Sequence, residues 1–189
     1  MSSLFKFASK SAAAFIALVL ISSVAYGADN LIADGDNTVP VAASPVSFGT
    51  ICINNSGSHD ALLALKHSGS SNIFKNSSVV TVSVSSVSVS SGAPAGLSVA
   101  ASMTTSQITL PSTWEASSNG TMSSSVTSHL IATAGASAGS FSGTVLYDAT
   151  GTSAATGNPS LTRSGALNFS GTVSNTGSCA SDTTAPTVT

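Results

Sequence analysis

The 189-residue sequence predicts an all-β fold, a sandwich of about seven to nine antiparallel strands, on three observations. Val, Thr, Ser and Gly dominate, and no window of eleven residues carries an uninterrupted apolar stripe at helical spacing. Short segments of alternating apolar and polar residues recur instead. Gly, Asn, Pro and Ser gather between these segments, as turns require. Strong internal repetition is absent, which argues against a propeller or solenoid.

The clearest predicted strand runs from Val80 to Val84, where Val on one face alternates with Thr and Ser on the other. At Ser85-Ser86 the alternation slips, and Val87 and Val89 continue in the opposite phase. A β-bulge or tight bend at this point would return the valines to the core.

The other predicted strands have the same short, alternating character. They are residues 38–43, 46–53, 60–67, 97–103, 106–110, 125–132, 140–148 and 161–173. The predicted turns between them are residues 54–58, 68–70, 91–96, 117–120 and 150–159. Trp114, the only tryptophan, is expected to close one end of the core.

Residues 1–27 have the pattern of a secretory signal peptide. Lys6 and Lys10 precede an apolar run of about fourteen residues, shorter than the roughly 20 that span a bilayer. Small residues at Ala25 and Gly27 indicate cleavage before Ala28, and no Cys follows that would carry a lipid anchor. We therefore expect an exported protein, extracellular, on the cell surface or in the periplasm, with no membrane contact in its mature form.

The remaining residues are enough for one domain, which we place at 28–179. The mature chain keeps three basic residues against seven acidic ones, a net charge of −4, so it offers no basic surface to nucleic acid. Ser and Thr make up about a third of the chain. Disorder is disfavoured because 42% of residues are hydrophobic and the mean hydropathy is +0.38.

The two cysteines, Cys52 and Cys179, lie near the two ends of the predicted domain. In a protein sent to an oxidising compartment we expect a disulfide between them, and two free thiols are the alternative. The chain-entropy model gives a loop of this length roughly 4–5 kcal/mol of stabilisation.

The motifs that carry chemistry elsewhere are weak in this sequence. Gly135-Ala136-Ser137-Ala138-Gly139 matches the G-x-S-x-G nucleophile elbow, but residues 140–146 after it read as a strand, whereas that motif needs a following helix. Glu115 is the only Glu, so no carboxylate pair stands out for acid–base work. We expect no catalytic residue, no enzyme activity and no cofactor.

A metal site is not expected either, and the one weak candidate is a calcium-binding turn. Asp34, Asp36 and Asn37 offer closely spaced oxygens around Gly35. Calcium takes six to eight ligands, and no nearby Glu or further Asp completes the set, so a solvated turn is the favoured interpretation. The three histidines show no metal-binding spacing.

Three stretches resemble a known group of bacterial surface modules. They are Pro45–Ile53 with its Phe48-Gly49 pair, Ile108–Trp114, and Gly139–Tyr147 with the return strand ending at Gly171-Thr172-Val173. Together they resemble the immunoglobulin-like repeats of bacterial extracellular proteins, the ASH and choice-of-anchor D modules, over most of residues 36–179. This chain departs from those repeats at Asn54-Asn55, where they place a Gly turn. The resemblance implies an immunoglobulin-like β-sandwich.

Residues 180–189 are Thr- and Pro-rich and are similar to the linker that opens a following domain in tandem surface proteins. The chain is then a fragment of a longer protein or, if complete, ends in a tail able to pair with a neighbour's strand edge.

The resemblance implies a spacer, an adhesive part or an assembly part rather than a catalyst. We expect a secreted or cell-surface structural or adhesive module whose partners are other domains or subunits of a surface or filament protein, with a glycan or host-surface ligand as a further partner class. The first alternative is a filament subunit joined to its neighbours by strand addition. The second is a carbohydrate-binding accessory module, disfavoured by an aromatic content of only 5%.

Overall fold

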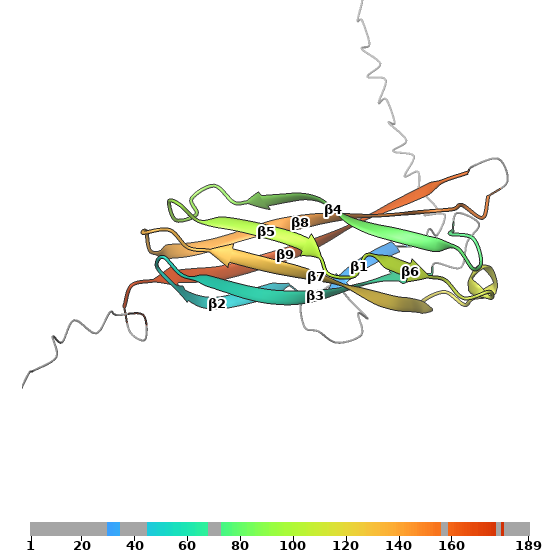
Figure 1. The fold of residues 1–189 in the computed structure, drawn as a ribbon, viewed down its shortest axis with the longest axis horizontal. Coiled ribbons are helices and arrows are strands. Elements are labelled where there is room, and N and C mark those ends of the chain that lie inside the picture. The colour runs from blue at the N-terminus through green and yellow to red at the C-terminus, as the bar shows by residue number, and fades with distance from the viewer. Residues whose placement is uncertain (1–29, 35–44, 68–72, 156–158, 177–178, 180–189) are drawn as a thin grey trace, which may run out of the picture.

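The structure, a computed structural model, describes residues 30–34, 45–67, 73–155, 159–176 and 179. Two sheets make up nearly all of this part and enclose one core (Figure 1). In order across the first sheet, the strands are β1 (Asn30–Asp34), β3 (Ser56–Lys66), β7 (Met122–Thr133) and β5 (Ser98–Met103). Across the second they are β2 (Val46–Cys52), β9 (Leu161–Ser174), β8 (Gly139–Gly151), β4 (Val79–Val89) and β6 (Gln107–Thr109). The predicted all-β sandwich is confirmed, with one difference: β2 pairs with β9 in parallel, whereas antiparallel strands were predicted.

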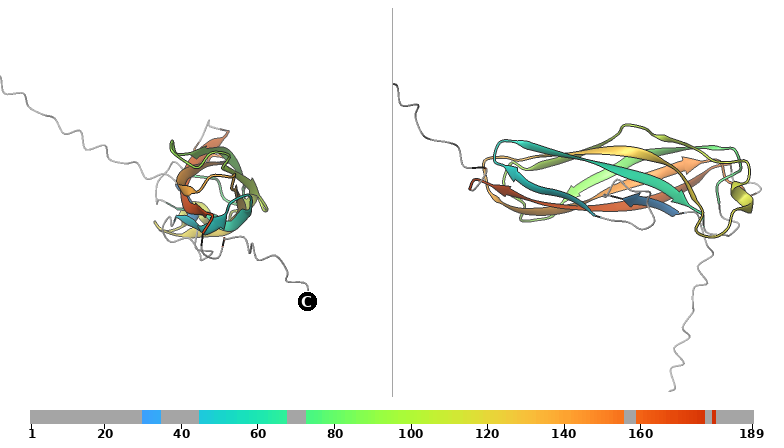
Figure 2. Two further views of the ribbon diagram at one scale, coloured as in Figure 1. Left: turned by 90° about the vertical axis from the view of Figure 1, so that its left-hand side faces the viewer. Right: turned by 90° about the horizontal axis from the view of Figure 1, so that it is seen from below.

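The strand order is that of an immunoglobulin-like sandwich. That fold places strands A, B, E and D in one sheet and C, F and G in the other. Here β1, β3, β7 and β5 take the first set of places, and β4, β8 and β9 take the second. One connection departs from the usual chain order, because the chain crosses to β5 on the first sheet and returns to β6 on the second before it enters β7. Seen end-on, the strands surround the core as two curved layers (Figure 2).

Eight of the predicted strands fall on β2 to β9. The predicted strand 38–43 lies outside the described residues. Three local assignments were wrong. The predicted turn at 150–159 begins later, because β8 continues to Gly151. The predicted turn at 54–58 is shorter, because β3 already begins at Ser56, paired with Thr133 of β7. β1 was not predicted: Asn and Asp at its ends disfavour strands, and pairing with β3 overrides that preference.

The bulge expected in β4 is confirmed at Ser85. Val84 pairs with Tyr147 and Ser86 with Leu146, so Ser85 has no partner of its own on β8. The extra residue reverses the phase of the strand. Val82 is therefore buried before the bulge, and the valines after it are still partly packed against the core.

Trp114 closes one end of the sandwich, as predicted. It is fully buried in η1 (Trp114–Ala116), a single 3₁₀ turn seen at the right of Figure 1. His67, which directly follows β3, is also buried, and its ring meets the Trp114 ring edge-on with centroids 5.1 Å apart. This end is therefore sealed by aromatic packing.

Three phenylalanines pack together toward the other end. Ring centroids of Phe48, Phe141 and Phe169 lie 6.0 to 6.5 Å apart. Glycines make room for them: a Cβ on Gly143 would lie 2.3 Å from Phe169, and one on Gly171 would lie 2.5 Å from Phe141. The three rings can pack this closely only because glycine occupies the facing strand positions.

The Phe48-Gly49 pair, which carried part of the family resemblance, forms an irregularity in β2. Ser47 pairs with Ser170 and Thr50 with Thr172, so two residues of β2 face one residue of β9. Gly49 has φ +61°, a conformation that glycine adopts without strain. The bulge lets both Phe48 and Ile51 turn inward.

Candidate functional site

The outer face of the five-stranded sheet carries rows of hydroxyl groups. Rows in register across β4, β8 and β9 are Thr81–Thr150–Thr162, Ser83–Asp148–Ser164 and Ser88–Thr144–Asn168. Within them, Ser164 Oγ donates to Asp148 Oδ1 at 2.6 Å, and Thr144 Oγ1 donates to Asn168 Oδ1 at 2.9 Å. These rows, which we call the hydroxyl face, form a polar surface in which Asp148 is the single charged side chain.

The outer face of the four-stranded sheet brings together Asp60, His129 and Ser102. They lie opposite one another on β3, β7 and β5. His129 Nδ1 and Asp60 Oδ1 are 2.5 Å apart. These are the residue types of a hydrolase triad, but the structure forms no hydrogen bond between Ser102 and His129. Ser102 is also the penultimate residue of a strand and does not lie on a turn beside backbone donors. Sequence reasoning missed this row because its members come from three separate strands.

Ser137, the candidate nucleophile, lies in the connection between β7 and β8. A strand follows it directly, since Gly139 opens β8. The connection packs closely on the β4–β5 loop, where a Cβ on Gly135 would lie 2.5 Å from the Ala95 carbonyl oxygen. Ser137 therefore lacks the strand-to-helix context that a nucleophile elbow needs.

The calcium candidates divide between described and undescribed residues. Asp34 is the last residue of β1, while Asp36 and Asn37 lie outside the described residues. In the part of the chain that the structure describes, no three His, Cys, Asp or Glu residues gather where they could hold a metal ion. The same part contains no helix that is long and apolar enough to cross a membrane.

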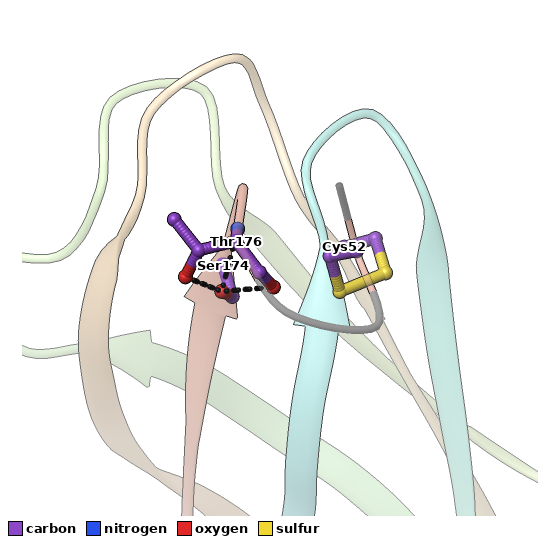
Figure 3. Close-up of a disulfide and its surroundings, with 4 residues drawn as sticks. Cys52, Ser174 and Thr176 are labelled. Carbon is purple, nitrogen blue, oxygen red and sulfur yellow. Dashed lines mark hydrogen bonds between the residues drawn. A yellow bond between two sulfur atoms is a disulfide. The ribbon is translucent and has the colours of Figure 1, made fainter. Parts of the chain in front are cut away.

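The structure joins Cys52 and Cys179 by a disulfide with a Cα–Cα distance of 5.1 Å. Cys52 is the last residue of β2, and Cys179 follows β9, the strand beside it (Figure 3). The backbone N–H of Ile53 donates to the Ser174 carbonyl at 3.1 Å, and Ser174 Oγ bonds with Thr176. The bond therefore fastens the C-terminal side of β9 to the edge strand β2.

The Asn54-Asn55 departure from the family pattern has a local explanation. Asn54 has φ +59°, a left-handed conformation that Asn tolerates better than most residues. It can therefore occupy the turn position that the related repeats fill with glycine. Its N–H donates to the Gly135 carbonyl at 3.1 Å, which ties the β2–β3 turn to the β7–β8 connection. This end of the sandwich thus gathers two loops and the disulfide.

No family model matches the sequence, and no curated protein matches it significantly. Among solved structures, the CupB6 tip adhesin from Pseudomonas aeruginosa is similar over 69% of this chain, at 16% identity and a TM-score of 0.37. CfaE, the adhesive subunit of CFA/I fimbria of enterotoxigenic Escherichia coli, is similar over 78%, at 10% identity and a TM-score of 0.38. A family 123 glycoside hydrolase from Clostridium perfringens is similar over 68%, at 12% identity and a TM-score of 0.27.

The chain spans 41%, 49% and 23% of those three structures. Likenesses at this level assign no family, so the class of the protein comes from its own strand order. It is an immunoglobulin-like β-sandwich protein whose cysteines join the end of an edge strand to the segment after the last strand. The relation to ASH and choice-of-anchor D modules stays a prediction.

Proposed function

We propose that the protein is an exported structural or adhesive module, one unit of a larger cell-surface assembly. The observation that carries this proposal is that the described chain enters and leaves the sandwich at opposite ends. Asn30 pairs with Lys66 at the C-terminal end of β3, whereas Cys179 is bonded to Cys52 beside the start of that strand. A module with this path joins others end to end.

The surface supports a role in contact. The hydroxyl face is nearly uncharged, and the one carboxylate in its rows is held by Ser164. Export follows from the signal-peptide pattern of residues 1–27, and the disulfide agrees with an oxidising compartment. The Thr- and Pro-rich residues 180–189 would then link the module to its neighbour.

A filament subunit joined by strand addition is the second candidate, and one observation favours it. β5 pairs only with β7, and β4 pairs with β6 only through Val79–Thr81, so β5 and the rest of β4 each have an unpaired edge within the described chain. Neither edge contains Pro or a charged residue, the usual protection against added strands. A carbohydrate-binding module has less support, because five of the six described aromatic side chains are buried and Phe48 packs partly against them.

The test is to express the full chain in its native host and label intact cells with an antibody against the purified protein. A surface module is labelled on intact cells, and labelling that needs cell lysis contradicts the proposal. Light scattering on the purified protein separates the two candidates: the module gives a discrete monomer, whereas a subunit joined by strand addition gives growing fibres.

A further inference from the structure

The disulfide divides the covalent chain into two routes between its ends. Residues 53–178 lie inside the loop that the Cys52–Cys179 bond closes, with a sequence separation of 127 between the two cysteines. A pull on the two ends of the chain travels from β1 through β2 to Cys52 and crosses the sulfur–sulfur bond to Cys179. Strands β3 to β9 are not on this route.

The two strands on the route already run from one end of the sandwich to the other. β1 is antiparallel to β3, and β2 ends just before β3 begins, so β1 and β2 run in the same direction. The route begins beside the last residue of β3 and ends beside the first, so the length of β3 gives the distance between the two ends of the route. For its eleven residues this is about 36 Å at roughly 3.3 Å per residue. The strands β1 and β2 on this route are therefore already extended in the direction of the pull before any force acts.

Tension on this chain rests on the proposed function, because a unit of a tandem surface protein is pulled at its two ends. We propose that the module is a load-bearing tether, in which the disulfide takes the tension past the sandwich core and leaves only the segment before Cys52 able to lengthen. Strands β3 to β9, which lie inside the disulfide loop, then stay folded while the assembly is stretched, and Leu31, Val46 and Ile51 of β1 and β2 are the core residues that leave.

The expected lengthening of the module under force differs greatly between the oxidised and the reduced protein. Residues 30–52 span at most about 80 Å when fully extended, and the folded route covers about 36 Å, so the disulfide-bonded module lengthens by roughly 50 Å or less. With the bond reduced, residues 30–179 span up to about 540 Å, and the gain rises to roughly 500 Å. The difference is about tenfold.

The test is single-molecule force spectroscopy on the whole chain, fused at both ends to marker domains of known unfolding length. The oxidised protein is expected to give steps of roughly 50 Å or less, and the same preparation in dithiothreitol is expected to give steps near 500 Å. The paired variant Cys52→Ser with Cys179→Ser gives the long step with or without reductant, and if it fails to fold, the comparison of oxidised and reduced wild-type chain still decides.

A long step in the oxidised protein, or equal steps with and without reductant, would overturn the tether. A control inserts the C-terminal marker at Gly120 instead, in the loop before β7, so that tension crosses the interior of the disulfide loop. That geometry is expected to give a step well above 50 Å, up to roughly 290 Å, even in the oxidised protein. The step lengths do not depend on where the cell places the protein. Failed surface labelling would therefore contradict the proposed function without changing these lengths.

Discussion

Tyr147 Oη donates a hydrogen bond to Ser128 Oγ at 3.0 Å, and this contact joins the two sheets through the middle of the core. Both residues are fully buried, Tyr147 on β8 and Ser128 on β7. Ser128 Oγ in turn donates to the Ser102 carbonyl of β5 at 3.2 Å. A short polar chain therefore crosses the mainly apolar interior and holds one sheet in register with the other.

Removing Ser128 is expected to cost more than removing the tyrosine hydroxyl. Ser128→Ala leaves the Tyr147 hydroxyl buried without a partner, which costs about 1–3 kcal/mol of unfolding free energy. Tyr147→Phe removes that hydroxyl with its bond and leaves Ser128 its bond to Ser102, at about 0.5–1.5 kcal/mol. Urea unfolding of the two variants and the wild type measures both, and a larger loss for Tyr147→Phe would contradict this view of the polar chain.

Stability is expected to fall in alkali because of Tyr147. Burial raises the pKa of its hydroxyl above 10.0 and outweighs the opposing effect of the hydrogen bond to Ser128. Above pH 10 the unfolded chain therefore loses this proton while the folded chain keeps it, so the free energy of unfolding decreases as the pH rises. Unfolding curves at pH 8 to 11 should show a steeper decline for the wild type than for Tyr147→Phe, and parallel declines would exclude Tyr147 as the cause.

Two glycine substitutions are expected to differ in cost for different reasons. Gly49→Ala meets no atom within 4 Å but must hold φ +61°, at about 1–2 kcal/mol. Gly143→Ala places its Cβ 2.2 Å from the Ser88 carbonyl oxygen as well as against Phe169, so the phenylalanine cluster must open at about 3 kcal/mol or more. Thermal unfolding compares them, and equal losses would mean that the cluster repacks freely.

Loss of the disulfide is expected to weaken the fold without changing its strand content. The chain-entropy model gives about 4–5 kcal/mol for a loop of this length, and measured losses are often smaller. Guanidinium unfolding of the Cys52→Ser, Cys179→Ser pair should show a lowered midpoint, while far-ultraviolet circular dichroism keeps its β signature. An unchanged midpoint would show that the reduced chain is already held at this end by the Ile53–Ser174 hydrogen bond.

Individual strands were predictable from the sequence because alternation is a local property. The bulge at Ser85 could be placed for the same reason, since a change of phase within one strand is visible in the order of its valines. Trp114 at one end followed from its position after Leu110-Pro111. In each case the information lies within a few neighbouring residues.

Pairings between strands that are distant in the chain could not be predicted from the sequence. The parallel contact of β2 with β9 and the Asp60–His129–Ser102 row depend on registers set by the whole core. β1 was missed because its stability comes from β3 and not from its own residues. The roles of Gly143 and Gly171 appear only once Phe141 and Phe169 lie against them.

Export and closure of the sandwich by Cys52–Cys179 are tested most directly by one measurement. It is the intact mass of the protein released by cells that express the full chain from Met1, taken before and after reduction. The expected mass is that of a chain beginning at Ala28, and it increases by two hydrogen atoms on reduction. A product that keeps residues 1–27, or one whose mass does not change on reduction, would contradict it.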